Sequence, residues 1–412
     1  MEKYEKVSLF PTDLLLPKDI DMSKWSVVAC DQYTSQPEYW EDVKNIISDS
    51  ASTFNLVLPE IYLNGDNVDE KIKRINDNMQ KYVDEGVFEE CKASLLYIER
   101  TLNNGKMRKG IVGAIDLENY KFEPGNNAMI RATEGTVLER IPPRVKVREN
   151  ACLELPHVML LIDDADDIVF GSIVSDNLEK VYDFDLMKDS GHLRGWKIDN
   201  CEIIADKLIE LYDKNYEHNN TMLYAVGDGN HSLATAKACW ENIKKSGADV
   251  ENHPARYALV EIENIHDNAL DFEPIHRILF NCDADNLLKE LDEYCGITEV
   301  ENKNAQQISS VVSGKVTKLY IKNSTSNLAV GTLQNFLDKY IESNNCTIDY
   351  IHGDDVVVKL SEQENSIGFL LPSMEKSDLF KTIITDGILP RKTFSMGEAC
   401  DKRFYVEARK IK

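Results

Sequence analysis

The sequence lacks several features by which whole classes of protein are recognised. Of its 412 residues, 42% are hydrophobic, yet no apolar run approaches the roughly 18 residues of a membrane-spanning helix. The first residues, Met1 to Lys6, alternate in charge and are not followed by the long apolar segment of a secretory signal. The sequence therefore predicts a cytoplasmic protein that does not enter a membrane.

Cysteine pairs and positive charge are also scarce. Nine cysteines are scattered along the chain without a CxxC pair, which is typical of reduced, buried thiols rather than of disulfides or a zinc site. Acidic residues number 71 against 47 basic ones, a formal net charge of −24 that repels polyanions. We therefore expect no nucleic-acid partner, whereas a small anionic substrate or a nucleotide can bind where basic residues gather in one cleft.

The common nucleotide and hydrolase motifs are missing as well. The chain contains no GxxxxGK[ST], no GxGxxG after a strand and no GxSxG. These absences exclude the P-loop, the dinucleotide-binding fingerprint and the hydrolase nucleophile elbow.

Strand-like and helix-like stretches alternate along the whole chain, which favours an α/β protein with mixed sheets (α+β). Periodicity predicts helices over 39–47, 68–83, 203–212, 232–243, 284–294 and 333–341. Apolar runs predict strands at 25–29, 155–162, 222–226, 257–262, 318–321, 355–360 and 367–371. We expect three parts: an N-terminal α/β part (1–90), a core (91–280) and a C-terminal α/β domain (281–412), of which the segment 387–397 returns to the cleft.

The strongest functional signal is the run Gly227-Asp228-Gly229-Asn230-His231-Ser232, which follows an apolar strand and opens a helix. Two glycines permit positive φ and close backbone approach, and the helix start offers unpaired amides to a phosphate. Asp228 is suited to hold Mg²⁺ or orient a hydroxyl, while Asn230, His231 and Ser232 are suited to contact phosphate oxygens or a leaving group. The alternative is an Asp-Gly turn whose Asn or Ser merely caps the helix.

A second signal lies between Arg131 and Arg148. It opens with Arg131-Ala132-Thr133-Glu134-Gly135-Thr136 and continues with Arg140, Arg144, Lys146 and Arg148. Guanidinium groups clamp phosphate or carboxylate bidentately, and Glu134 is a candidate general base. We assign Arg140 and Arg144 to phosphate, and Arg131 and Thr136 to substrate. The alternative is a solvated surface that balances neighbouring carboxylates.

Weaker signals come later in the chain. His276 and Arg277 follow Pro274, and Lys392 lies in the basic segment 387–397, so all three are candidates to bind substrate. A lone histidine is more often a satisfied structural residue, which is the alternative for His276. His157 lies within an apolar run, and we predict that it belongs to the core.

Taken in order, four segments resemble domain-of-unknown-function family 1015. They are 131–136, 227–232, Glu273-Pro274-Ile275-His276-Arg277 and Leu389-Pro390-Arg391-Lys392-Thr393-Phe394. In that family the central motif reads Asp-Gly-His-His-Arg-Tyr, after a His-Glu-x-Thr element. Here Asn230, Ser232 and Leu233 replace the first histidine, the arginine and the tyrosine, and Thr133 stands where the histidine of His-Glu would be. The chain is identified as a divergent member in which Arg140 or Lys392 is a candidate to replace the arginine.

The central motif is also similar to the Asp-Gly-(Asn/His)-His-Arg signature of the ParB and sulfiredoxin superfold. That superfold includes a free serine kinase and nucleotide-hydrolysing DNA-partition proteins. The resemblance implies a ParB/sulfiredoxin-like core over 91–280 with a nucleotide or phosphoester site. It further implies a catalytic glutamate, for which Glu134 is the candidate.

Three functions remain open from the sequence. The first is a phosphoryl-transfer enzyme of small-molecule metabolism, such as a serine or phosphoserine kinase or phosphatase, with Mg²⁺ and ATP or ADP as cofactor and co-substrate. In it, Glu134, Asp228 and His231 are catalytic, and Asp228 is the metal ligand. The second is a non-catalytic nucleotide-sensing interaction module, and the third is a cofactor-free hydrolase of a carboxylate metabolite. Each is compatible with a homodimer.

Overall fold

The computed structural model describes residues 1–63, 65–136, 138–216, 221–247 and 249–412. They form two compact units, Met1–Leu270 with Glu398–Lys412, and Asp271–Gly397. The expected three-part division differs from this. Residues 1–90 join the following part because strand β1 (Leu9–Phe10) pairs with strand β5 (Met107–Asp116). The last residues of the chain rejoin the first unit instead of ending in the second.

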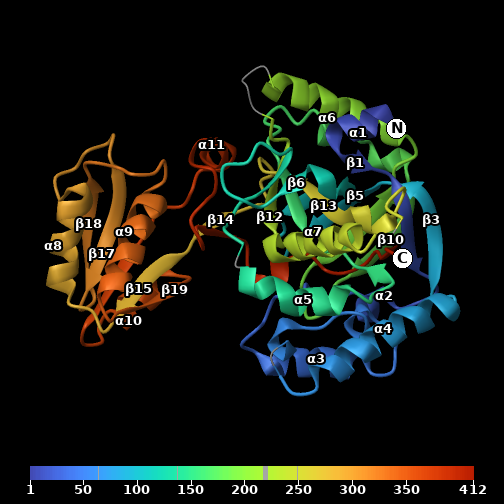
Figure 1. The fold of residues 1–412 in the computed structure, drawn as a ribbon, viewed down its shortest axis with the longest axis horizontal. Coiled ribbons are helices and arrows are strands. Elements are labelled where there is room, and N and C mark those ends of the chain that lie inside the picture. The colour runs from blue at the N-terminus through green and yellow to red at the C-terminus, as the bar shows by residue number, and fades with distance from the viewer. Residues whose placement is uncertain (64, 137, 217–220, 248) are drawn as a thin grey trace. The chain divides into compact units, whose positions relative to one another are not determined.

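The first unit is built on one mixed sheet (Figure 1). Its strand order is β10 (Glu179–Asp185), β11 (His192–Lys197), β4 (Leu96–Thr101), β5, β13 (Tyr257–Asn264), β9 (Met159–Ile162), β12 (Tyr224–Asp228), β7 (Ile130–Ala132) and β6 (Tyr120–Lys121). Strand β12 runs parallel to β7 and antiparallel to β9, while β9 and β13 are parallel. The mixed sheet confirms the α+β class.

Both faces of this sheet are covered. Successive residues of β5 point to opposite sides, so that Ile111 belongs to one hydrophobic cluster and Val112 to another. The first cluster is closed by α6 (Cys201–Tyr216) and α7 (Asn230–Lys245), and the second by α3 (Pro37–Ile47). Because both faces are buried, β9 is a continuous apolar run, as the sequence indicated, whereas β13 ends in the buried polar residues Glu261, Glu263 and Asn264.

Smaller elements complete the first unit. They are α1 (Glu2–Val7), β2 (Thr12–Pro17), α2 (Met22–Trp25), α4 (Val68–Asp84), β3 (Phe88–Ser94), α5 (Ile141–Arg148), β8 (Leu153–Glu154) and β22 (Arg409–Lys410). The helix predicted at 68–83 is confirmed as α4, which buries Ile72, Ile75 and Met79 on one stripe. Of the strand predicted at 25–29, Trp25 ends the short helix α2, and Val28 forms only an isolated bridge with Phe404. Of the strand predicted at 155–162, only Met159–Ile162 is extended and paired.

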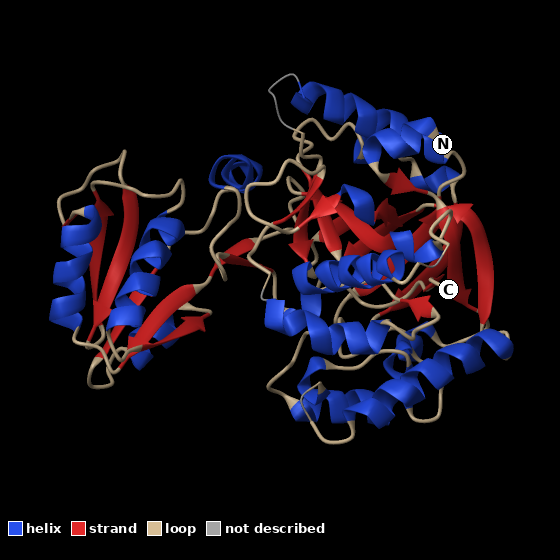
Figure 2. Cartoon of the chain, viewed as in Figure 1, coloured by secondary structure: helices blue, strands red, loops and turns tan. Residues whose placement is uncertain are grey.

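The second unit is a smaller α/β unit (Figure 2). Its main sheet has the order β16 (Ile297–Thr298), β18 (Lys315–Ile321), β17 (Gln306–Val312), β20 (Ser366–Leu370), β15 (His276–Phe280) and β19 (Thr347–Ile351). A two-stranded sheet pairs β14 (Phe272–Pro274) with β21 (Phe394–Met396). The helices are α8 (Ala284–Cys295), α9 (Ala329–Ser343), α10 (Asp354–Leu360) and α11 (Lys376–Asp386). The strand predicted at 355–360 is therefore wrong: Asp354 and Asp355 begin a helix that buries Val357 alone.

The tail after Gly397 is built into the first unit. Phe404 bridges Val28, Ala408 bridges Leu15, and β22 pairs with β8. Arg403 is buried and pairs with Glu261 at 2.7 Å and with Glu407 at 2.8 Å. A removed partner would leave a buried charge unpaired, so these bonds hold the tail firmly in place.

Candidate functional site

The two strongest sequence motifs lie at the carboxyl ends of neighbouring parallel strands. Strand β12 ends at Asp228, and β7 is followed by Thr133 and Glu134. In the register of the two strands, Val226 is opposite Ala132. Parallel strands end at the same edge of a sheet, so the Arg131–Thr136 segment and the Gly-Asp-Gly turn share that edge.

Hydrogen bonds join the two segments directly. Oδ1 of Asn230 accepts from the backbone N–H of Thr133 at 3.2 Å, and Nδ2 of Asn230 donates to Oγ1 of Thr133 at 3.2 Å. The Thr133 hydroxyl in turn donates to the carbonyl of Val226 at 2.7 Å. Thr133 is buried, whereas Glu134, next to it, is half-buried. The structure thus brings Glu134 to the start of α7.

The turn itself needs glycine. Gly229 has φ +79°, and a Cβ at this position would lie 3.1 Å from both Cα and Cγ2 of Val158. Helix α7 begins directly after it, with His231 in its first turn. The side chains of Asn230 and Ser232 bond to Thr133 and His157 rather than capping the helix. Among the residues that the structure describes, no side chain caps the helix, and the positive end of its dipole favours an anion at this turn.

Asp228 is held by a residue that the sequence analysis did not single out. Its Oδ1 accepts from the N–H of Gly229 at 3.0 Å, and its Oδ2 lies 3.3 Å from Nζ of Lys402 on the returning tail. An ammonium group at this distance competes with a metal ion for the carboxylate. Among the described residues, no group of three or more His, Cys, Asp or Glu side chains is arranged to hold a metal. The assignment of Asp228 to Mg²⁺ therefore stays a prediction, and any ion there would compete with Lys402.

The arginine segment does not form the expected anion clamp. Arg131 is buried and donates to the carbonyl of Ala128 and the hydroxyl of Thr221. Arg144 forms an ion pair with Glu60 and donates to the carbonyl of Arg140. Both guanidinium groups thus bond to protein acceptors, and their assignments, Arg131 to substrate and Arg144 to phosphate, stay predictions.

The other two members of this segment differ from each other. Arg140 is exposed at the start of α5, so its assignment to phosphate stays a prediction. The hydroxyl oxygen of Thr136 is buried and makes no hydrogen bond within the described part of the chain. The Thr136 hydroxyl can therefore donate a hydrogen bond to a substrate. Its predicted role in substrate binding is untested.

The remaining predicted residues belong to the second unit. Arg277 is fully buried and donates to Gln334 and to the carbonyls of Ile275, Arg391 and Lys392. His276 is also buried, where its Nδ1 accepts from the N–H of Leu371 and its Nε2 lies 2.7 Å from Asp354. These bonds make both residues anchors of the second unit, which corrects their assignment to substrate.

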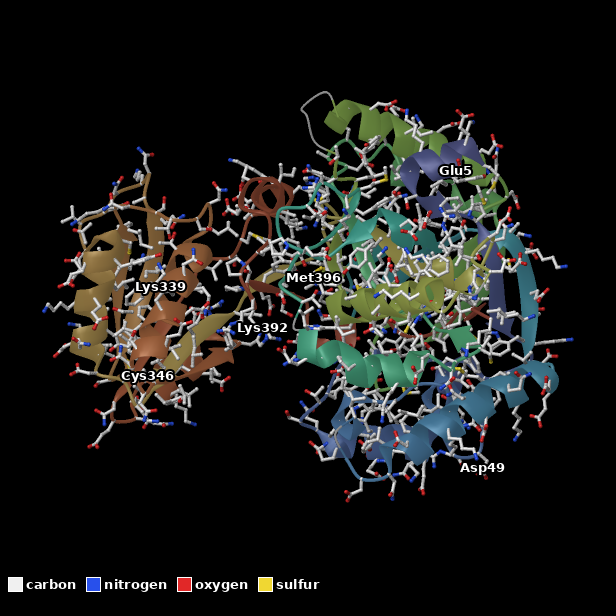
Figure 3. The ribbon with its side chains drawn as sticks, in the orientation of Figure 1. Glu5, Asp49, Lys339, Cys346, Lys392 and Met396 are labelled. Carbon is white, nitrogen blue, oxygen red and sulfur yellow. The ribbon has the colours of Figure 1, made fainter. Side chains whose placement is uncertain are left out.

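Lys392 has an exposed side chain and a left-handed backbone with φ +57°. It lies on the segment that leads to Met396 in β21 (Figure 3). Its predicted role in substrate binding is untested.

A cavity of about 160 Å³ lies beside α7, on the side that faces α5. Ser232 and His157 line it, with Oγ of Ser232 2.6 Å from Nε2 of His157. The other ring nitrogen of His157, Nδ1, lies 2.9 Å from the hydroxyl of Tyr405. His157 is buried, as predicted, but no sequence pattern indicated that both of its ring nitrogens are bonded.

Two residues of the site were thus missed: Lys402 and Tyr405, the partner of His157. The only available signals were the basic pair Lys402-Arg403 in an acidic chain and the polar His157 in an apolar run. Neither signal indicates which residue the side chain bonds to.

Fold and site together define a mixed α+β protein with a strand–Gly-Asp-Gly–helix junction. The family model described as "Protein of unknown function (DUF1015)" matches residues 14–340. The chain belongs to that family. No curated protein matches it.

Solved structures offer distant likenesses. A conserved hypothetical protein from Pyrococcus furiosus is 11% identical, with a TM-score of 0.34 over 69% of this chain and 90% of that one. A free serine kinase in complex with AMP is 11% identical, with a TM-score of 0.38 over 71% and 90%. SbnI with a C-terminal truncation, from Staphylococcus aureus, is 10% identical, with a TM-score of 0.38 over 70% and 82%. At these scores the likeness bears on neither substrate nor mechanism.

No helix in the described ranges is both long and apolar enough to cross a membrane.

Proposed function

We propose that this chain is a phosphoryl-transfer enzyme that binds the phosphate of a nucleotide, ATP or ADP, or of a phosphorylated metabolite at the first turn of α7. The observation that carries the proposal is the pair of hydrogen bonds between Asn230 and Thr133. Through these bonds, the helix start and the strand end that precedes Glu134 form one edge. A phosphate bound at the helix start would then lie beside the segment that carries the candidate base, Glu134.

Charge around this edge supports the same chemistry. The positive end of the dipole of the 16-residue helix α7 and the ammonium of Lys402 both favour a phosphate group. Asp228 pairs with Lys402 and positions its ammonium. In phosphoryl transfer, positioning and charge stabilisation supply most of the rate, and few covalent steps fall to the protein. Glu134 would accept the proton of the attacking hydroxyl, and His231, in the first helical turn, would contact the transferred group.

The acceptor we test first is serine or its phosphorylated form. Purified protein is incubated with serine and ATP, or with phosphoserine and ADP, and products are followed by phosphorus NMR. We expect Glu134→Gln to slow turnover by about 100-fold or more, the range lost with a general base. Glu139→Gln is the matched control, because Glu139 is exposed in the same segment.

The outcomes separate the candidate functions. Nucleotide binding by calorimetry without any product would favour the non-catalytic sensing module. Absence of both binding and turnover would refute the phosphate site itself. Full activity in Asp228→Asn would show that Asp228 and its bond to Lys402 are not needed.

A further inference from the structure

The cavity beside α7 contains a hydroxyl and an imidazole in the geometry of a nucleophile and its base. Oγ of Ser232 lies 2.6 Å from Nε2 of His157. A positioned base within hydrogen-bond distance is the requirement for activating a serine. The Ser232 side chain bonds to His157 and lines the cavity, whereas the Asn230 side chain bonds to Thr133.

The histidine is held by a third residue. Nδ1 of His157 lies 2.9 Å from the hydroxyl of Tyr405, and that hydroxyl also accepts from the backbone N–H of Cys30 at 3.1 Å. With Nδ1 protonated and donating to Tyr405, Nε2 is left as the acceptor that the Ser232 proton needs. Burial raises the pKa of Tyr405 well above its ordinary value, so the third member is a neutral phenol.

The lining of the cavity indicates which group it accepts. Ser232, His157 and Tyr405 lie at one end, and aliphatic side chains form much of the rest, among them Leu56, Leu58, Leu153, Leu233, Ala236 and Leu259. The volume of about 160 Å³ is close to that of an apolar cavity that holds one benzene molecule. The cavity is partly open to solvent, which provides a path of entry. An apolar group of about six carbon atoms therefore fits.

The position of Ser232 also allows the negative charge that develops on the ester carbonyl oxygen to be stabilised. Ser232 lies in the first turn of α7, directly after the Gly-Asp-Gly turn that follows β12. First-turn amides and the positive end of the helix dipole stabilise an oxyanion there. The strand–turn–helix setting resembles a nucleophile elbow although the GxSxG pattern is absent.

We propose that Ser232 is the nucleophile of a second active site, which cleaves esters of short apolar acyl groups with His157 as general base. Oγ of Ser232 bonds to the acyl carbon, its proton passes to Nε2 of His157, and the ester C–O bond breaks. The leaving alcohol takes that proton. Water then attacks the acyl-serine, gives one proton to His157 and releases the carboxylic acid, and Oγ of Ser232 recovers its proton. The reaction requires neither nucleotide nor metal, so it can be measured apart from phosphoryl transfer although both proposals draw on the start of α7.

A fluorophosphonate probe and p-nitrophenyl esters test this site in the full-length protein. We expect probe labelling of the wild-type chain and none of Ser232→Ala. His157→Gln should slow hydrolysis of the butyrate ester by about 100-fold or more. Thr235→Val is the matched control, since Thr235 lines the same cavity but its hydroxyl bonds to a backbone carbonyl.

Two further measurements keep the proposal falsifiable. The octanoate ester should react more slowly than the butyrate ester, because eight carbons exceed the cavity. Tyr405 is a positioning residue, so Tyr405→Phe should move the midpoint of the rising limb of the pH–rate profile, which a purely packing role would leave in place. Tryptophan fluorescence checks that each variant is folded. Absence of labelling in the wild-type protein, or equal labelling of Ser232→Ala, would overturn the proposal.

Discussion

Replacement of Thr133 by valine is the most direct test of the junction that joins the two motifs. The side chain is 1% exposed, and its hydroxyl donates to the carbonyl of Val226 and accepts from Asn230. Valine keeps the shape but removes both hydrogen bonds. Each is worth about 0.5–1.5 kcal/mol, so we expect a loss of about 1–3 kcal/mol.

A matched control lies three residues further on. The hydroxyl of Thr136 makes no hydrogen bond within the described ranges, so Thr136→Val should change stability by no more than about 0.5 kcal/mol, or raise it slightly. The two substitutions are chemically identical. Any difference between them therefore measures the bonds of Thr133.

Urea unfolding followed by tryptophan fluorescence is the suitable assay. The four tryptophans, Trp25, Trp40, Trp196 and Trp240, all belong to the first unit, so the signal does not report on the second. We also expect Thr133→Val to weaken nucleotide binding, because one of the two hydrogen bonds that join Asn230 of α7 to Thr133 is lost. If Thr133→Val and Thr136→Val have the same urea midpoint, the hydrogen bonds of the Thr133 hydroxyl do not stabilise the joint between β7 and α7.

Three further predictions concern other parts of the molecule. Gly229→Ala should cost about 1–2 kcal/mol from its left-handed backbone alone, with more from contact with Val158, and urea unfolding of the first unit measures it. Partial burial raises the pKa of Glu118, but hydrogen bonds from Lys244 and Trp240 outweigh it and lower the pKa to about 2. The stability that the ionised Glu118 contributes is present above about pH 4.5 and is lost as the pH falls through 2. In Glu118→Gln, the free energy of unfolding should therefore fall less between these two pH values. Arg277→Met should destabilise the second unit by about 3 kcal/mol, because buried carbonyls lose their donor; circular dichroism should detect the loss, and tryptophan fluorescence should not.

Local patterns predicted most elements correctly. The stripe in α4 and the Gly-Asp-Gly turn before α7 were evident, because a helix repeats every 3.6 residues and a positive φ calls for glycine. The same reasoning failed at α10, where three consecutive valines indicate a strand although only Val357 is buried. Their β propensity was overridden by the packing of one helical face.

The sequence by itself determined the α+β class, the family and the strand–turn–helix that opens at Asn230, because each follows from residues that are neighbours in the chain. Only the tertiary structure decided what these residues bond to. Arg277 donates to backbone carbonyls, and Asp228 pairs with Lys402. His157 bonds to Tyr405, which lies 248 positions further along the chain. Side-chain composition shows that a group can donate or accept a proton, but its partner depends on the path of the whole chain. That path is set by burial of the apolar faces of distant strands and helices.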